Sequence, residues 1–393
     1  MSREEAIEFA RMLVAAVNEH DTALIVSLYK DDAIMISPMF PRVEGRAAIA
    51  SNWERTFSLF PDWAVHLSDV MVDGDRVALL GTATGTDRNG WFGQPSTGER
   101  IDYRAIIYLT FANGKIVRDE RVYDLTGVLQ RLEKSRIDKE LRMAADVQRT
   151  LLAHTRHLTP FCDAIASSIP CRAVGGDLFE LAQLPSGDFL VALGDVAGKG
   201  PASALLAAMI LGMLAIEREG ECRVSTVLAH MNQILFRRGL EPRFATLIVG
   251  RLSPDGTFAY SNAGHNAPLL LTRNGIRRLT VGGPVLGAFS GSTFEEATVY
   301  LRDQDTIVLF SDGVTEAVDS AGAEFGEERL IKCSSELLAH PAPEMLQGIL
   351  SAVRDFSRTT TLADDITVAV TRFLGGEILS ESVDTVNEPQ RPA

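Results

Sequence analysis

Aspartates recur in the second half of the chain at junctions between apolar, strand-like runs and glycine-containing turns. They are Asp177 in VGGD, Asp195 in FLVALGDV, Asp312 in TIVLFSDG, and Asp364 and Asp365 in LADDITVAV. The end of a strand holds a side chain rigidly, and glycine lets the backbone approach an ion closely. Hard divalent cations prefer carboxylate, carbonyl and water oxygens as ligands. If the strand ends converge, these residues predict a site for Mg²⁺ or Mn²⁺.

Each of these segments also has an ordinary structural explanation. An Asp-Gly pair, as at Asp312, is typical of a turn, and the Asp364-Asp365 pair is typical of solvated side chains. GDVAGKG is similar to a phosphate-binding loop, but a Walker A loop has four residues between its glycines and then Gly-Lys-Ser/Thr. Proline follows the last glycine here, so nucleotide binding through this loop is excluded. The specific signal is the order and spacing of all the segments together.

The region from about 156 to 374 must supply the elements that position these aspartates. Its predicted strands cover 188–193, 244–252, 257–263, 268–272, 295–300, 305–310 and 365–373, and its predicted helices cover 203–217, 224–237 and 343–356. The strand assignments depend on short apolar runs bounded by turn residues, and the helix assignments on apolar residues three and four apart. This alternation indicates β-sheets layered with helices.

The same region carries a series of longer motifs. They are VGGDLFE, GDVAGKGPASALL, ATLIVGRLSPDG, YSNAGHNAPLLL, GGPVLGAF, LFSDGVTEA, FGEERL and DDITVAV. With these motifs, in this order, residues 156 to 374 resemble the sporulation-stage-II-E type of the metal-dependent protein phosphatases (PPM), the bacterial branch of the 2C phosphatases. The resemblance implies a two-sheet sandwich flanked by helices, with the metals in a cleft at one end. Glu180 stands where aspartate is usual and Leu178-Phe179 where an aromatic pair is common, but neither touches the proposed ligands.

The resemblance also implies a role for each acidic residue around two ions, Mn²⁺ or Mg²⁺. Asp195 would bridge the ions, and the backbone carbonyl of Val196 would bind one of them. Asp312 and Asp364 would complete the second ion. The first acidic position of the final motif is the usual ligand in the family, so Asp364 is preferred over Asp365.

Two further residues complete the predicted site. Asp177 would bind the first ion, directly or through water. Arg172 lies five residues before it, which is the spacing of the phosphate-clamping arginine in the wider superfamily; a plain surface arginine on a strand stays an equal alternative. Ions about 3.5–4 Å apart can share a water and lower its pKa toward neutrality, which gives a hydroxide able to attack phosphorus in line.

A serine and a histidine in these motifs invite other mechanisms. Ser311 precedes Asp312, but the sequence pattern places no histidine to activate it as a nucleophile. His265 in AGHNAP could serve as a general acid. A structural role in the turn between Asn262 and Asn266 is the preferred interpretation.

Residues 1 to about 130 follow a different pattern. Predicted helices at the start and over 46–59 accompany strand-like runs over 33–37, 64–72, 76–86, 100–111 and 115–123. Asp-Gly-Asp at 73–75 and Asn-Gly at 113–114 are hairpin signals between such runs. The segments LYKDDAIMISP, VEGRAAIASNWERTF and IDYRAIIYLTFANGKIVRDERVYD resemble the SnoaL-like, nuclear-transport-factor-like fold, which implies a cone of helices and curved sheet around an apolar pocket.

That fold hosts isomerases, cyclases and pure binding domains, so it does not fix a function. The residues expected to line the pocket are Tyr103, His66, Trp63, Trp91 and Asp124. Catalysis would need a pocket carboxylate with a raised pKa near an oxyanion donor, and the sequence places no such pair. A sensory pocket for a small ligand is therefore preferred over an enzyme in this domain.

A helical pattern over about 125 to 155 joins the two regions. Its apolar seam runs for about four heptads, which is marginal for a coiled coil. Two alternatives stay open: a paired helix in a homodimer, or a single amphipathic helix packed on a neighbouring domain. The predicted organisation is α+β, with a SnoaL-like cone over 1–130, a linker helix over 131–155, a PPM-type α/β/β/α sandwich over 156–376 and a disordered tail over 377–393.

Composition narrows the class of protein. The formal net charge of −14 argues against nucleic-acid binding, which needs a basic surface. The four cysteines form no CxxC pair and no zinc-ligand spacing. The N-terminus lacks the pattern of a signal peptide, and the longest nearly apolar stretch, 201–216, is too short to span a bilayer. A cytoplasmic protein that does not enter a membrane is expected.

These observations favour a metal-dependent phosphoserine/phosphothreonine phosphatase. By resemblance, its expected substrate is an anti-anti-sigma factor of the STAS type in a partner-switching pathway, with regulation by the first domain. The alternatives are a catalytically silent scaffold or small-molecule-binding regulator, which the complete set of aspartates argues against, and a cyclase or isomerase activity in the first domain.

Overall fold

The structure is a computed structural model that describes residues 2–91, 93–152, 156–218, 223–239, 244–358 and 362–375. The chain divides into two compact units, 1–140 and 141–393. The division falls inside helix α4 (Leu125–Leu151), within the segment for which a linker helix is predicted. The predicted tail and the last residues of the predicted linker lie outside the described residues.

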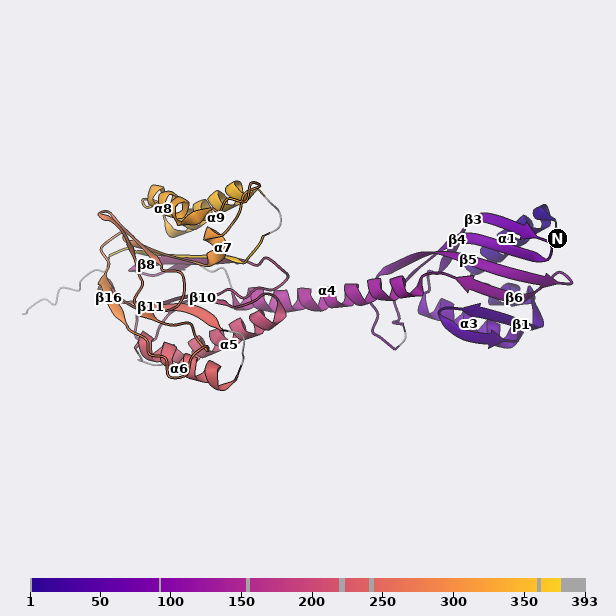
Figure 1. Ribbon diagram of the computed structural model, residues 1–393, viewed down its shortest axis with the longest axis horizontal. Coiled ribbons are helices and arrows are strands. Elements are labelled where there is room, and N and C mark those ends of the chain that lie inside the picture. Colours follow the sequence, from indigo (N-terminus) through magenta and orange to yellow (C-terminus); the bar gives the residue numbers. More distant parts are fainter. Residues whose placement is uncertain are drawn as a thin grey trace, which may run out of the picture. The chain divides into compact units, whose positions relative to one another are not determined.

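The first unit combines helices with one six-stranded sheet (Figure 1). Its helices are α1 (Arg3–Asn18), α2 (Thr22–Ser27) and α3 (Arg46–Leu59). Its strands are β1 (Tyr29–Ser37), β2 (Phe40–Glu44), β3 (Ala64–Asp73), β4 (Arg76–Thr86), β5 (Arg100–Ala112) and β6 (Lys115–Val122). The sheet order is β2-β1-β6-β5-β4-β3, in which β1 and β6 are parallel and the other neighbours antiparallel.

Local sequence signals set the boundaries of these elements. A capping box starts α1, because Ser2 Oγ accepts from the Glu5 backbone N–H and the Glu5 carboxylate accepts from the Ser2 N–H. Asp21 caps the start of α2, because its carboxylate accepts from the Leu24 backbone N–H. The two predicted hairpins are confirmed, since residues 73–76 join β3 to β4 and residues 112–115 join β5 to β6.

The second unit has two sheets with helices on their outer faces (Figure 1). One sheet runs β15-β12-β11-β10-β9, with β16 also paired to β12, and consists of β9 (Leu178–Gln183), β10 (Phe189–Val196), β11 (Ala245–Leu252), β12 (Thr257–Ala263), β15 (Gly282–Gly283) and β16 (Ala297–Tyr300). The other runs β14-β13-β17-β18-β8-β7 and consists of β7 (His157–Leu158), β8 (Cys162–Ile169), β13 (Leu269–Thr272), β14 (Gly275–Arg278), β17 (Thr306–Phe310) and β18 (Ile366–Phe373).

Four helices cover the outer faces of these sheets. Helices α5 (Pro201–Glu217) and α6 (Val224–Arg237) pack on the sheet that contains β10, and α8 (Gly326–Glu336) and α9 (Ala342–Ser357) pack on the sheet that contains β18. The order of layers is therefore helix, sheet, sheet, helix, as expected. A short helix, α7 (Asp312–Thr315), follows β17 directly.

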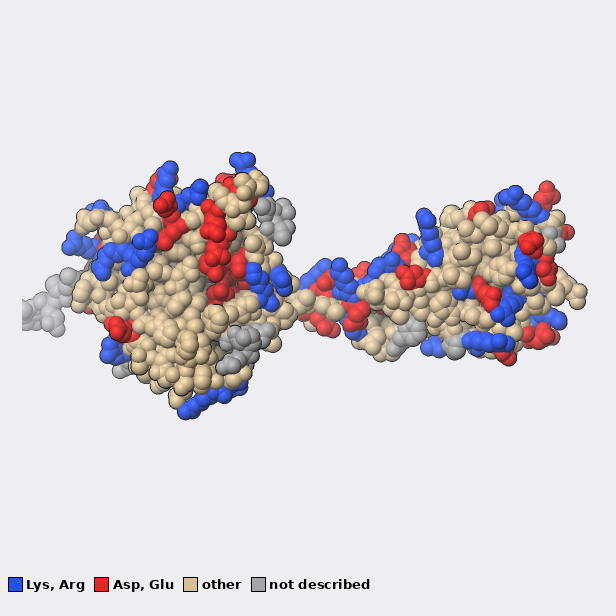
Figure 2. Space-filling view, viewed as in Figure 1, with Lys and Arg blue, Asp and Glu red and all other residues tan. Residues whose placement is uncertain are grey.

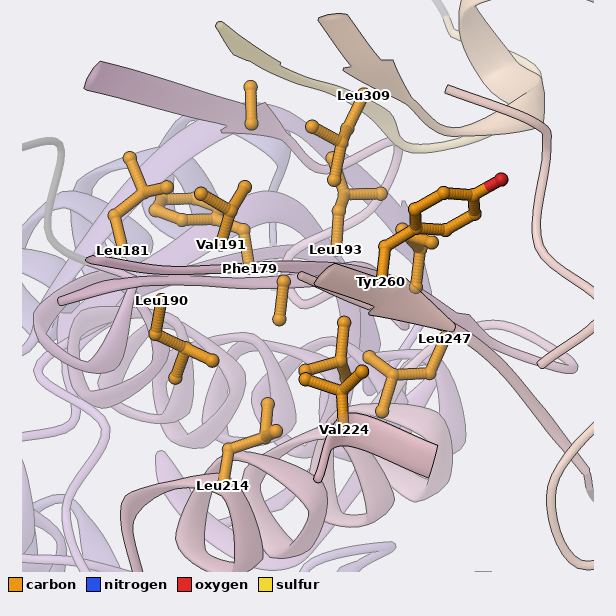
Figure 3. Close-up of a cluster of buried hydrophobic side chains, with 14 of the residues drawn as sticks. Phe179, Leu181, Leu190, Val191, Leu193, Leu214, Val224, Leu247, Tyr260 and Leu309 are labelled. Atoms are coloured by element: carbon orange, nitrogen blue, oxygen red, sulfur yellow. The ribbon is translucent and has the colours of Figure 1, made fainter. Parts of the chain in front are cut away.

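The interior of the sandwich follows the alternation of side chains along β10. Figure 3 shows Val191 and Leu193 on the side of the strand that faces Leu309 of the other sheet, whereas Leu190 lies on the side of Leu214 in α5. Because β10 is covered on both faces, all its apolar residues are buried. This double burial makes the strand rigid up to its end, where Asp195 lies.

Some elements were absent from the sequence prediction. Strands β8 and β9 were missed, since CDAIASSI is mostly small residues and neither strand is a continuous apolar run. Helix α8 was missed because only Leu330 and Ser334 of its residues are buried, so its apolar repeat is short. No helix in the described part of the chain is both long and apolar enough to cross a membrane.

Candidate functional site

The predicted aspartates lie where both sheets of the second unit meet at one end. Asp195 is the penultimate residue of β10, and Asp177 immediately precedes the neighbouring strand β9. In the other sheet, Asp312 follows β17, and Asp364 and Asp365 precede the adjacent β18. The two pairs of strands thus deliver all five side chains to one place. Figure 2 shows acidic side chains gathered in a band on the visible face of the second unit.

The proximity of these carboxylates is evident in their pKa values. Burial and, after it, the charges of Asp312 and Asp364 together raise the pKa of Asp195 to about 7. Burial and the charge of Asp195 raise the pKa of Asp177 well above its ordinary value. The pKa of Asp312 is also raised, by burial and then by Asp364. Several like charges held in one partly buried site are the condition that a bound cation relieves.

Glycines leave room for close approach at this point. A Cβ on Gly176 would lie 2.7 Å from the carbonyl oxygen of Val196 and 3.2 Å from Asp195 Oδ1. A Cβ on Gly313 would collide with the backbone oxygen of Asp365. The Val196 carbonyl and the Asp195 carboxylate therefore face the same glycine-lined space. Carboxylates and a backbone carbonyl that face this space form a donor set that fits Mg²⁺ or Mn²⁺.

The two neighbouring aspartates before β18 have different surroundings. Asp365 is 4% exposed, and its carboxylate accepts from the backbone N–H of Cys171 and of Gly176, each at 2.7 Å. The Asp364 side chain is 36% exposed and forms an ion pair of 2.9 Å with Lys199. Asp365 is thus engaged in holding the loop before β9, while Asp364 presents its carboxylate toward solvent. This difference supports the preference for Asp364 as a ligand.

Arg172 lies in that same loop and is exposed. No hydrogen bond or ion pair joins its guanidinium to another residue in the described parts of the chain. Its neighbour Cys171 is tied to Asp365, so the backbone of Arg172 is anchored beside the carboxylates. The structure places it on a loop and not on a strand, and its role as a phosphate clamp stays a prediction.

The histidine and serine of the motifs have structural partners. His265 is buried, and its Nδ1 lies 2.8 Å from the hydroxyl of Thr246. Asn262 accepts from the His265 N–H and donates to its carbonyl, which closes the turn. Burial lowers the pKa of His265 to about 4, so the ring is neutral at pH 7. Ser311 is fully buried and joins the start of β18, since it donates to the Asp365 carbonyl.

Four residues near the site were not predicted. Thr367 donates a hydrogen bond of 2.5 Å to Asp177, and Lys199 pairs with Asp364. The sulfur of Cys171 lies within 4.8 Å of carboxylate oxygens of Asp364 and Asp365. Gln148 of α4 donates to the carbonyl of Gly175 at 2.8 Å and accepts from its N–H at 3.0 Å. Lys199 lies inside a recognised motif, whereas nothing in the sequence marked Gln148.

The first unit contains a cavity between α1, α3 and the sheet. Of the residues expected to line it, Tyr103 and Trp63 do so. The other three do not, because His66 is exposed on β3, Trp91 lines a separate hollow beside α4, and Asp124 accepts from the Gly127 N–H at the start of α4. Alternation along β3 would have separated His66 from the inward-facing Val65 and Leu67.

Comparison with known proteins agrees with both halves of the architecture. A family model described as stage II sporulation protein E (SpoIIE) matches residues 185–374, and a SnoaL-like domain model matches residues 10–119. The phosphoserine phosphatase RsbU of Bacillus subtilis (strain 168) is 30% identical over 242 residues, which cover 60% of this chain and 70% of the relative. The chain therefore belongs to the SpoIIE family of PPM-type phosphatases, with a SnoaL-like domain preceding the catalytic one.

Two more distant similarities accompany this match. Protein IcfG of Synechocystis sp. is 24% identical over 192 residues, which cover 42% of this chain and 30% of that protein. The SiaA-PP2C domain of Pseudomonas aeruginosa has a TM-score of 0.54 and 19% identity, over 61% of this chain and 98% of that domain. The second similarity establishes the 2C-phosphatase fold of the second unit.

The clustered charges predict a pH-dependent effect of Asp195→Asn on stability. In the presence of a chelator, the folded protein must keep this carboxylate charged above about pH 7, whereas the unfolded chain ionises it near its ordinary value. The Asp195 charge therefore destabilises the folded native protein fully above about pH 7, and this destabilisation disappears near pH 3.8. Asn removes the charge, so thermal unfolding should show a higher Tm for the variant at pH 8 and a smaller gain as the pH falls.

With Mn²⁺ present, the native protein should have the higher Tm, because the ion should raise the Tm of the native protein and not that of Asp195→Asn. The control is Glu336→Gln, which removes an exposed carboxylate on α8. A variant that is less stable than the native protein in chelator at pH 8 would contradict the proposed charge repulsion.

Proposed function

We propose that this protein hydrolyses phosphoserine or phosphothreonine in a STAS-type anti-anti-sigma factor, with two Mn²⁺ or Mg²⁺ ions and under control of its first unit. The observation that carries the proposal is the convergence of Asp177, Asp195, Asp312 and Asp364 at one end of the sandwich. The similarity to RsbU, whose name specifies a phosphoserine phosphatase, supports the substrate class. The resemblance to this family supports the STAS partner and the partner-switching role.

Each residue has a proposed task at this site. Asp195 would bind both ions, and the Val196 carbonyl would bind one of them. Asp177 would bind the first ion, and Asp312 and Asp364 the second. When bound, the ions would activate a water and offset charge on the phosphoryl oxygens. Asp365 would keep the loop before β9 in place through its hydrogen bonds to backbone N–H groups.

A catalytically silent scaffold is the main alternative, and the complete set of carboxylates speaks against it. A cyclase or isomerase in the first unit is the other. Asp119 is the only carboxylate among the described residues that line its cavity, and it already binds Arg121 and Tyr29. A carboxylate held in this way is poorly placed to act as a general base, which supports a sensory role for this unit.

The catalytic proposal predicts Mn²⁺-dependent hydrolysis of p-nitrophenyl phosphate and of a serine-phosphorylated STAS protein. Asp312→Asn should lower kcat by at least about a hundredfold, since removing one charged ligand impairs the second ion. Release of inorganic phosphate from the full-length protein is the measurement, and Glu336→Gln is the control. Equal turnover with and without divalent cations would overturn the metal-dependent assignment, and no turnover with either ion would favour the scaffold.

Arg172 has a separate predicted effect. Because its guanidinium has no protein partner in the described structure, it is available to bind phosphate in a bidentate manner. Arg172→Ala should lower kcat/KM by about ten- to a hundredfold, consistent with losing charge-assisted hydrogen bonds to the transition state. Mn²⁺ affinity, measured by calorimetry, should stay unchanged. A loss of Mn²⁺ binding instead of turnover would assign Arg172 to the structure of the loop.

The structure also supports a route for regulation. Gln148 of α4 binds both backbone groups of Gly175, which lies two residues before Asp177. The same part of α4 borders an apolar groove against α5, lined by Val147, Leu151 and Leu205 among others. Helix α5 begins five residues after Val196. Movement of α4 would therefore reach the loop of Asp177 and the helix that follows Asp195.

The homodimer proposal depends on the same helix. Ile137, Met143, Val147 and Leu151 of α4 are exposed apolar residues, which a second copy of the helix could cover. Small-molecule binding in the first unit and pairing of α4 could both regulate phosphatase activity. A ligand would shift activity only through unequal affinity for the two positions of α4.

Gln148→Ala tests this route. The variant should keep the Mn²⁺ affinity of the native protein, but its activity should no longer depend on the presence of residues 1–140. The comparison uses phosphate release and sedimentation of the full-length and shortened proteins, with Gln347→Ala on α9 as the matched control. If the variant responds to removal of the first unit as the native chain does, the link through Gly175 is not the route.

A further inference from the structure

The cavity of the first unit is built mainly from apolar side chains. Its volume is about 60 Å³, well above the roughly 10–15 Å³ that one water molecule requires. Leu13 and Val17 of α1, Leu79 of β4 and Ile107 of β5 contribute to its walls. An apolar enclosure of this kind favours an apolar occupant over water.

The charges beside the cavity are already matched. Arg121 donates to both oxygens of Asp119, at 3.2 and 2.9 Å, and Tyr29 donates to the same carboxylate at 2.6 Å. Burial alone would lower the pKa of Arg121, but the charge and hydrogen bonds of Asp119, together with Tyr29 and Tyr103, raise this pKa above its ordinary value, so the guanidinium stays charged. Asp119 and Arg121 are the only charged side chains among the described residues that line the cavity. An anionic ligand would find no unpaired cation, and burying an unpaired charge is costly.

Two hydrogen-bond donors beside the cavity are not matched. Trp53 and Trp63 both line it, and they are 3% and 5% exposed. Neither indole Nε1 has a hydrogen-bond acceptor in the described structure. Trp53 is held in place by the guanidinium of Arg121, 4.6 Å from its ring centre. Buried donors without acceptors are uncommon in native proteins and indicate a partner that the chain itself does not supply.

We propose that this cavity binds a neutral, largely apolar small molecule whose carbonyl-type oxygen accepts hydrogen bonds from the indole N–H groups of Trp53 and Trp63. The apolar walls select the body of the ligand, the Asp119–Arg121 pair excludes a net charge, and the two indoles select an acceptor. This inference deepens the proposed regulatory role of the first unit and rests on that role only for its connection to phosphatase activity.

The test uses three probes of equal heavy-atom number with the full-length protein. Acetophenone carries the acceptor, α-methylstyrene replaces its oxygen with a methylene group, and benzoate adds a charge. Dissociation constants come from ligand-observed NMR titrations of the native protein, Trp53→Phe and Trp63→Phe. Phenylalanine keeps an aromatic ring and removes the N–H donor. Because both neutral probes report on the same folded fraction, partial unfolding of a variant cancels in the ratio of their constants.

We expect acetophenone to bind the native protein and benzoate not to bind at neutral pH. The ratio of the acetophenone constant to the α-methylstyrene constant should rise about fivefold in at least one variant, as for the loss of one ordinary hydrogen bond. The matched control is Trp91→Phe, in the same unit but outside the lining of this cavity; its ratio should stay at the native value.

An unchanged ratio in both cavity variants would overturn the role of the indoles. Benzoate binding as tight as that of acetophenone would overturn the neutral-ligand assignment, and the absence of binding by both neutral probes would overturn the site. These results are independent of phosphate release, so a failure here and a failure of the phosphatase proposal are distinguishable.

Discussion

The repulsion among carboxylates at one end of the sandwich is the constraint on which the second unit depends. Asp177, Asp195 and Asp312 approach one another in a setting where burial already disfavours their charges. A chain relieves such a concentration of charge by moving the groups apart, unless the surrounding structure is rigid. Here the rigidity comes from β10, which is buried on both faces, and from hydrogen bonds that fix the loops around the site.

The two units solve the problem of a buried carboxylate in opposite ways. In the first unit, Asp119 receives hydrogen bonds from Arg121 and Tyr29, so its charge is neutralised within the chain. In the second unit, Asp177 and Asp195 have each other as neighbours, and the charge remains unmatched. The first arrangement therefore suits a neutral ligand, and the second suits cations.

A single helix contributes to the geometry of the catalytic end. Gln148 of α4 closes a pair of hydrogen bonds with Gly175, and Asp365 binds the N–H of the next residue, Gly176. The loop that carries Asp177 is thus held by two elements. One is α4, which precedes this loop in the sequence, and the other is the residue just before β18, Asp365. Holding a short loop through its backbone makes its position sensitive to either support.

The sequence by itself predicted the class of the second unit from its series of motifs. It also predicted the candidate ligands, because these aspartates lie beside strand ends, and such a local pattern can be read without knowledge of the fold. It likewise determined the hairpins of the first unit, whose turn residues act over a few positions. Strands β8 and β9 and helix α8 escaped prediction because burial by distant elements, and not their own apolar pattern, stabilises them. Only the tertiary structure showed that Asp365 binds backbone N–H groups of the loop before β9, and only it revealed Gln148 and Thr367 beside the site. These contacts join backbone groups and side chains that are tens or hundreds of residues apart, so no local sequence pattern predicts them.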